Sequence, residues 1–498
     1  MSVDPLVQQA RTLLAQGRPS DALAVTAPIV AVDGASYAVV STHAGALKVL
    51  GRIDEALAFH RQAVITWPDS VVAWHNLGAL AGDAGDAAES REAIDRALAL
   101  GGNAAATWLV RARACWLLED RVGAEDGYRK ALARQPNLTE AACELAQAVW
   151  LGRADADAAA APLATALAAG ADPARIVFSQ SQLLQAVGRT DEARALVIAA
   201  ARARPDQPAL MLLAVRAAVE DGQTVLALEM VEQVARLGAP PLHVDLHRVM
   251  ALLAAGRTDE ALVVARRAAA GAPNAQDAWG WVATAARAAG DPHYGVLHDY
   301  DALVRGFDIE TPEGWPNLAA YLADLERALD AAHTDRAHRL DQSARGGTQT
   351  FGDLSLNPDP AIQAFYAAID APIRRYLAEL GSGKDPLRRR NTGDYALNGS
   401  WSVRLSPRGH HVDHFHPAAF ISSAFHVRMP EAALDIEHQG WLRFGQSPFP
   451  SVPPLAADHH VRPVAGRLVL FPSYMWHGTV PFEGEETRLS IAFDVVPA

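Results

Sequence analysis

A glycine recurs along the first three fifths of this 498-residue chain, and most of its intervals are 34 residues long. The glycines on this beat are Gly17, Gly51, Gly85, Gly152, Gly188, Gly222, Gly256 and Gly290. Glu119 stands at the one missing beat, and the interval from Gly152 to Gly188 is irregular at 36 residues. Glycine permits the positive φ that ends a helix, and an Asp or Ser just after it can cap the next. The period therefore predicts stacked helix-turn-helix units that bury their core between neighbours.

The text around these glycines also recurs, as LGRIDEALAFHRQAV, VGRTDEARALVIAA and AGRTDEALVVARRAA. Most beats are followed five places later by a small residue that lets two helices approach closely: Ala22, Ala56, Ala124, Ala193, Ala227 and Ala261. Prolines close several units, at Pro68, Pro136, Pro205 and Pro273. This pattern resembles the tetratricopeptide repeat family over roughly residues 3–309, in about nine units. The resemblance implies an α-solenoid over residues 1–309 whose concave face holds a peptide or protein, with a spacer or dimerisation platform as the alternative.

Charge and hydropathy exclude several classes of partner. Lys and Arg number 44 against 57 Asp and Glu, and the net charge of −13 repels the phosphate backbone of nucleic acids. No stretch approaches the ~18 consecutive apolar residues of a membrane span, and MSVDPLVQQA lacks the pattern of a secretory signal. We therefore expect a cytoplasmic protein with neither a nucleic-acid nor a membrane partner. The oligomeric state stays open.

The pattern changes after Ile309. TPEGWPNLAAYLADLERALDAAH predicts a helix, which makes residues 310–344 a connecting helix and linker, and PAIQAFYAAIDAPIRRYLAEL predicts a second helix. Between them, SARGGTQTFGDLSLNPD is glycine-rich and is expected to be irregular. From Trp401 onward, short β-branched and aromatic runs are separated by Gly and Pro, which predicts an antiparallel sandwich or jelly roll within residues 345–498.

Histidines concentrate in this C-terminal part, where nine of the chain's 18 lie between His410 and His477. Imidazole is a good ligand for iron, zinc, copper and nickel. His414 and His416 flank Phe415 in DHFHP, and on an extended segment two such residues point to the same side and can chelate one ion. His411 and Asp413 form an overlapping alternative pair. A further histidine, His477, follows a predicted buried strand, and Arg488 and Ser490 share one face of the last predicted strand.

These residues resemble the iron(II)- and 2-oxoglutarate-dependent oxygenases. That superfamily has a double-stranded β-helix with H-x-D or H-x-E, a distal His, and Arg-x-Ser about ten residues beyond it. The likeness is strongest to bacterial and phage oxygenases with a Trp-led strand, H-x-H-P, a Ser-rich strand and F-P-S-x-x-x-H. In this chain the corresponding residues are Trp401, His414 to Pro417, Ile421 to Ser423, and Phe471 to His477.

The resemblance implies a site with iron(II) as the metal, 2-oxoglutarate as the cosubstrate and ascorbate as a candidate reductant. The implied ligands are His414, His416 and His477, with Asp413 or His411 as alternative proximal ligands, because a second histidine stands where the superfamily usually has a carboxylate. Arg488 is implied to pair with the far carboxylate of 2-oxoglutarate, and Ser490 to donate a hydroxyl hydrogen bond. No catalytic residue beyond the metal ligands is expected.

The sequence thus predicts a 2-oxoglutarate-dependent hydroxylase whose repeats present a peptide or protein substrate. Two alternatives remain open. One is a three-histidine, cupin-like dioxygenase that uses no 2-oxoglutarate, and the other is a non-catalytic repeat adaptor with a degenerate metal-binding β domain. Release of succinate that depends on iron and 2-oxoglutarate separates the first interpretation from the other two.

Overall fold

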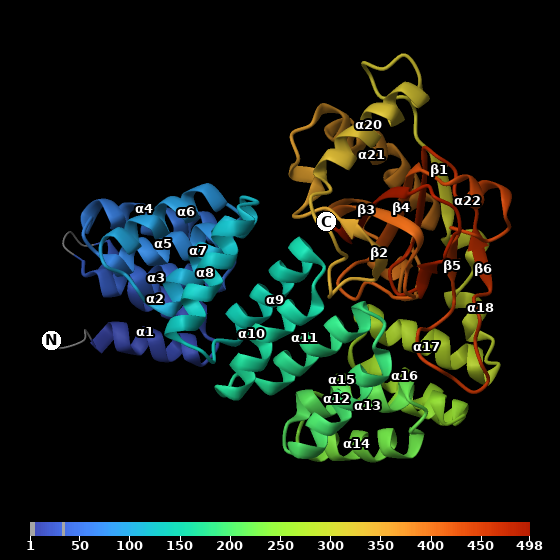
Figure 1. Cartoon of the computed structure of the whole chain (residues 1–498), viewed down its shortest axis with the longest axis horizontal. Coiled ribbons are helices and arrows are strands. Elements are labelled where there is room, and N and C mark those ends of the chain that lie inside the picture. Colours follow the sequence, from blue (N-terminus) through green and yellow to red (C-terminus); the bar gives the residue numbers. More distant parts are fainter. Residues whose placement is uncertain (1–4, 32–34) are drawn as a thin grey trace. The chain divides into compact units, whose positions relative to one another are not determined.

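The computed structural model describes residues 5–31 and 35–498. Seventeen helices occupy the described residues up to 289, as eight successive pairs and one further helix (Figure 1). The pairs are α1 (Pro5–Ala15) with α2 (Pro19–Val30), α3 (Tyr37–Val49) with α4 (Ile53–Thr66), α5 (Val71–Asp83) with α6 (Ala87–Ala99), α7 (Ala105–Leu117) with α8 (Arg121–Arg134), α9 (Thr139–Arg153) with α10 (Ala156–Ala168), α11 (Pro173–Ala186) with α12 (Thr190–Ala203), α13 (Pro208–Glu220) with α14 (Thr224–Arg236), and α15 (Pro241–Ala254) with α16 (Thr258–Gly271); α17 (Gln276–Ala289) follows them. The predicted helical repeat array is confirmed.

The turns inside the pairs explain the glycine beat and correct one position of it. Seven of the eight recurring glycines, all except Gly152, adopt positive φ, for example 71° at Gly17 and 74° at Gly256. Glu119, at the missing beat, does the same with φ of 58°. Gly152 lies inside α9 instead, and the positive φ falls on Ala154, at 55°. The predicted turn at Gly152 is therefore wrong by two residues, because the helix continues to Arg153 and Ala154 accepts a conformation that usually favours glycine.

By its internal contacts the chain divides into two compact units. The first comprises residues 1–149 and 157–172, and the second comprises residues 150–156 and 173–498. The second unit contains the repeat helices from α11 onward together with the whole C-terminal β structure. No helix in the described part of the chain is both long and apolar enough to cross a membrane.

Two antiparallel sheets build the C-terminal part. The six-stranded sheet has the order β1 (Arg305–Asp308), β7 (Arg467–Pro472), β4 (Ile421–Arg428), β9 (Arg488–Pro497), β3 (Tyr395–His411) and β2 (Ala344–Gln349). The three-stranded sheet has the order β6 (His459–Val461), β5 (Leu442–Phe444) and β8 (His477–Thr479). The chain passes from the large sheet to the small one between β7 and β8 and returns in β9. Phe444 and Phe471 pack across the sheets with ring centroids 5.0 Å apart. This is the predicted jelly-roll architecture.

Helices cover the outer face of the large sheet. The two predicted helices are present as α20 (Leu318–Ala332) and α21 (Pro360–Leu380), which Figure 1 shows beside β3 and β4. Phe365 of α21 packs on Phe425 of β4 at 4.8 Å between ring centroids. The smaller elements are α18 (His293–Leu297), α19 (Tyr300–Leu303), α22 (Glu431–Asp435) and the 3₁₀ turns at Leu354–Leu356 and Arg388–Arg390. The glycine-rich segment expected to be irregular contains strand β2, which pairs with β3 around a bulge at Gly346.

The β structure packs against the first helix of successive repeat pairs. Nε2 of Gln182 in α11 donates to the carbonyl of Leu340, and the amide of Val452 donates to the carbonyl of Leu253 in α15. A further contact involves α17, where the indole of Trp476 donates to Oγ1 of Thr284 at 2.9 Å. Helix α17 is consequently buried on nearly every side. In this unit, repeat helices form part of the core around the β domain.

Candidate metal centre

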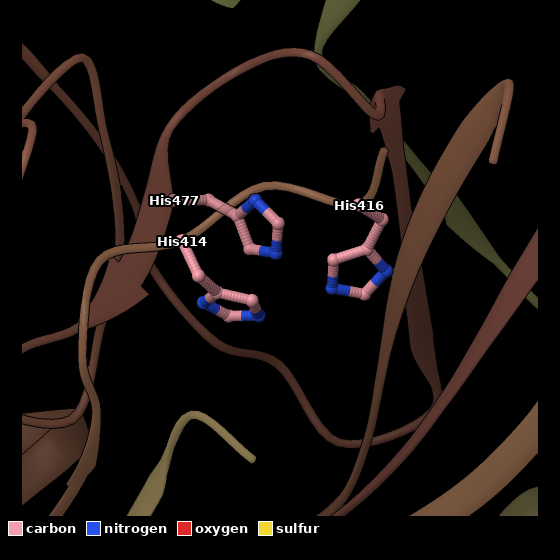
Figure 2. A group of neighbouring side chains, drawn as sticks. All are labelled: His414, His416 and His477. Atoms are coloured by element: carbon pink, nitrogen blue, oxygen red, sulfur yellow. The ribbon is translucent and has the colours of Figure 1, made fainter. Parts of the chain in front are cut away.

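The side chains of three histidines, His414, His416 and His477, lie close together (Figure 2). His414 and His416 lie on the segment that follows β3, and His477 is the first residue of β8. The segments are held together by a bridge in which the amides of His414 and His477 donate to each other's carbonyls at 2.9 Å. One ligand nitrogen from each residue lies within 4.8 Å of the others. The predicted H-x-H pair and the distal histidine therefore meet in space.

Each of the three rings has its Nδ1 engaged by an acceptor. Nδ1 of His414 donates to the carbonyl of Val412 at 2.8 Å, and Nδ1 of His477 donates to the carbonyl of Met475 at 3.0 Å. Nδ1 of His416 donates to Oδ1 of Asp494 at 2.6 Å. Such bonds fix the tautomer and the ring orientation of metal-binding histidines. They leave the three Nε2 atoms as the candidate donors, which suits a borderline ion such as iron(II).

Burial keeps the imidazoles of His414 and His477 in the neutral form that binds metal. Desolvation, and then the charge of His416, lower the pKa of His414 to about 3. The pKa of His477 is held well below its ordinary value, again by burial first and by the neighbouring histidines second. Neutral, oriented nitrogens are what a metal ion needs, because protons compete with the ion for the same lone pair.

The alternative proximal residues have other partners. The carboxylate of Asp413 accepts two hydrogen bonds from Arg443 of β5, at 2.6 and 2.8 Å, and is almost fully buried. Nδ1 of His411 lies 2.9 Å from Oγ of Ser343, and the same hydroxyl lies 3.2 Å from Nε2 of His414. Neither Asp413 nor His411 belongs to the group of three whose nitrogens converge.

Strand β9 presents a row of polar side chains to the centre. Arg488, Ser490 and Asp494 are separated by even numbers of positions and line one cavity, as strand alternation requires. Only 2% of Arg488 is exposed, and within the described part of the chain its Nε and Nη1 have no hydrogen-bond partner. Its Nη2 lies 3.5 Å from Nδ1 of His426. Burial lowers the pKa of Arg488 to about 10, so the guanidinium stays charged at neutral pH. A buried, uncompensated cation of this kind fits an anionic ligand.

The cavity that contains this centre has a volume of about 540 Å³. Strands β2, β3, β8 and β9 contribute to its wall. Repeat helices also contribute, through Phe178, Gln182 and Gln185 of α11 and Arg216 of α13. The candidate metal centre therefore opens towards the repeat helices that belong to the same compact unit.

Of the other candidates, few reach the cavity. Trp401 lines it with its ring 5.8 Å from that of His416, whereas Trp476 packs between Phe415 and Trp281 of α17. The remaining histidines of the cluster, His410, His426, His438, His459 and His460, do not line it. His426 lies next to Arg488, His438 stacks on His460, and His459 stacks on Tyr300.

Two residues that line the cavity, Asp494 and Arg345, were not predicted from the sequence. Asp494 was missed although it continues the alternation from Arg488 through Ser490, a signal that was readable in RLSIAFD. Arg345 on β2 was missed because its strand lies in a glycine-rich segment that gives no strand signal. The contributions of α11 and α13 could not be read at all, since they depend on how the two parts of the second unit pack.

Residues 399–494 match the model of a protein family described as "Putative 2OG-Fe(II) oxygenase". No match to a curated protein was found. Among solved structures, the crystal structure of MamA protein aligns with 33% of this chain and 89% of its own, at 17% identity and a TM-score of 0.29. The crystal structure of the APC/C hetero-tetramer Cut9-Hcn1 aligns with 56% of this chain and 55% of its own, at 14% identity and a TM-score of 0.33. This chain joins an array of paired helices to a C-terminal part in which residues 399–494 match the 2OG-Fe(II) oxygenase model.

Proposed function

We propose that this protein is an iron(II)- and 2-oxoglutarate-dependent oxygenase that hydroxylates a peptide or protein. His414, His416 and His477 would hold the iron, and Arg488 with Ser490 would hold the cosubstrate. When bound, iron and 2-oxoglutarate would together supply a reaction with dioxygen in which one oxygen atom converts the keto acid to succinate and CO2 and the other is inserted into a C–H bond. Three protein ligands are enough to fix a metal while leaving positions for other groups.

The chain's own residues orient and charge the site. Val412, Met475 and Asp494 accept from the Nδ1 atoms and so aim Nε2 of each histidine inwards. Asp413 and Arg443 tie the His414 segment to β5 of the small sheet. Burial and the charge of Arg488 hold the pKa of His426 well below its ordinary value. His426 therefore stays neutral beside Arg488 and does not repel it.

The buried guanidinium of Arg488 is the observation that carries the proposal. A charged group in this position is costly unless a ligand pairs with it, and a planar guanidinium suits a carboxylate. A three-histidine dioxygenase without a keto acid, or an adaptor with a degenerate site, gives this arginine no task. Both alternatives are therefore less well supported than the cosubstrate-dependent enzyme.

The proposed role of the repeats in substrate binding rests on the residues that they contribute to the cavity wall. Gln182 and Arg216 come from first helices of repeat pairs, so a substrate that reaches the metal passes the array. In the second unit the β domain already packs against these first helices, so we place a bound peptide in the cavity. The remaining array is proposed as a partner-binding surface, and the cytoplasm as the location.

The deciding experiment measures succinate from the full-length protein incubated with iron(II), 2-oxoglutarate and ascorbate, with and without a digest of cell peptides. Mass spectrometry of the peptides then looks for a gain of one oxygen. We expect succinate formation that requires both iron and 2-oxoglutarate. Metal retention without any 2-oxoglutarate turnover would favour the three-histidine alternative, and absence of metal binding would favour the adaptor.

A further inference from the structure

The cavity beside the three histidines carries a charge that the proposed cosubstrate does not use. Apart from histidines, six charged side chains line it: Arg216, Arg345, Arg488, Asp341, Asp413 and Asp494. Three are positive and three are negative, so the charge that a substrate meets depends on which of them are already paired. We therefore followed each one to its partner.

All three carboxylates are occupied by partners within the chain. Asp413 pairs with Arg443 at 2.6 Å, and Asp494 accepts from His416 at 2.6 Å. Asp341, the most exposed of them, lies 3.8 Å from the guanidinium of Arg339. Asp413 is therefore neutralised by an arginine, Asp341 lies near one, and the charge of Asp494 is directed at the ring of His416.

The arginines are compensated less completely. Nε of Arg216 donates to Glu220 on the same helix at 3.0 Å, and its guanidinium lies over the ring of Phe449. Arg488 is reserved for the far carboxylate of 2-oxoglutarate under the proposed function. Arg345 remains, and among the residues that the structure describes it forms no ion pair with a carboxylate.

The position of Arg345 makes this charge accessible to a ligand. Its Nη1 donates to the carbonyls of Gln342 and Ala344, at 2.6 and 2.9 Å, which anchors one nitrogen and leaves Nε and Nη2 for another acceptor. Its strand contains a bulge between Arg345 and Gly347, a feature that redirects side chains at sheet edges. Arg216 and Arg345 both line the cavity, and burial, followed by the charge of Arg216, lowers the pKa of Arg345.

We propose that the substrate of this site carries a carboxylate, and that Arg345 binds this carboxylate and selects it. The inference rests on the proposed function, because it assigns Arg488 to the cosubstrate. One uncompensated guanidinium matches one single negative charge, and its planar fork matches two carboxylate oxygens. The glutamines Gln182, Gln185, Gln342 and Gln349 line the same cavity and supply amide groups for the rest of an extended peptide.

The carboxylate could belong to an Asp or Glu side chain of a peptide or to a small free acid, and the test distinguishes the two. Full-length protein is loaded with iron(II) and 2-oxoglutarate without oxygen, so that Arg488 is occupied and no turnover occurs. Fluorescein-labelled ten-residue peptide pools, random except at the centre, are then titrated by anisotropy. The pools have Asp or Glu, Asn or Gln, or phosphoserine at the central position, and unlabelled N-acetylglutamate serves as the small-acid competitor.

We expect the acidic pool to bind at least tenfold more tightly than the amide pool, which corresponds to about 1.4 kcal/mol. Arg345→Gln should abolish this preference, and Arg345→Lys should keep part of it, which also covers the case that the glutamine variant does not fold. Arg374→Gln, on the exposed surface of α21, is the matched control and should keep the full preference. Displacement of the acidic pool by N-acetylglutamate at equal concentration would assign the carboxylate to a small acid, and displacement by peptides alone would assign it to a peptide.

Several outcomes would overturn the inference: no preference for the acidic pool in the wild type, a preference that survives in Arg345→Gln, tighter binding of the phosphoserine pool, or loss of 2-oxoglutarate binding in Arg345→Gln. The last would assign Arg345 to the cosubstrate. Failure of the proposed function looks different, because it is the absence of iron- and 2-oxoglutarate-dependent succinate from wild-type protein, whatever the peptide preference.

Discussion

Nδ1 of His416 and Oδ1 of Asp494 lie 2.6 Å apart, and this bond joins the H-x-H segment to the last strand of the large sheet. Asp494 also accepts from Oγ of Ser422 on β4, at 2.9 Å. The carboxylate is therefore fixed from two sides and in turn fixes the ring. It couples one candidate ligand to the strand that carries Arg488.

Asp494→Asn should weaken metal binding by about 10- to 100-fold, because the neutral amide is a poorer acceptor and lowers the basicity of the His416 ring. Titration of metal-free protein with iron(II) or cobalt(II) measures the change. Asp308→Asn, which alters an exposed ion pair with Arg467, is the control and should bind metal as the wild type does. An unchanged affinity in Asp494→Asn would mean that His416 is not a ligand.

His477→Ala should abolish metal retention, since the two remaining histidines cannot hold an ion in a fixed geometry.

Arg443→Met should act differently, because it leaves the buried carboxylate of Asp413 without its partner and should lower the free energy of unfolding by about 3–5 kcal/mol. Denaturant unfolding and metal analysis of both variants separate a ligand from a residue that positions the His414 segment. If Asp413→Ala loses iron while His416→Ala keeps it, the three-histidine assignment is wrong.

Arg488→Ala should weaken binding of 2-oxoglutarate by about 30-fold or more, because truncating one member of a desolvated, charge-assisted pair costs roughly 2–5 kcal/mol. Arg488→Lys should fall between wild type and Ala, since it restores the charge without the planar fork. Iron content should be similar in all three proteins. The measurement is a titration of 2-oxoglutarate followed by the quenching of tryptophan fluorescence, and equal affinity in the Ala variant would contradict the assignment.

Gly280→Val should destabilise the second unit by about 1–3 kcal/mol, because overpacking forces side chains and backbone apart. A Cβ at Gly280 would lie 2.8 Å from the carbonyl oxygen of Tyr474 and 3.3 Å from the ring of Phe415, which stands between His414 and His416. The expected result is a lower melting temperature together with weaker metal binding. Gly271→Ala, at the end of α16 with open space around it, is the matched control and should have neither effect.

The repeat array could be predicted from the sequence because its signals are local. A turn glycine, a small packing residue and a closing proline each act within one helix pair. Because these signals recur with the same period, the sequence alone identifies the repeats. The one error, at Gly152, arose where glycine lies within a helix and Ala154 takes the positive φ. Glycine permits the left-handed conformation without requiring it, so its position alone cannot fix a turn.

The sequence by itself also determined which residues form the candidate centre, since His414, His416, His477, Arg488 and Ser490 keep a spacing set by strands and short loops. Only the tertiary structure decided what surrounds them. Asp494 binds His416 across 78 positions, and Arg443 binds Asp413 across 30 positions. Arg345 lines the same cavity without a carboxylate partner among the described residues. The packing of α17 against Trp476 spans 192 positions. Such contacts follow from which surfaces pack together, and neither spacing nor periodicity along the chain encodes them.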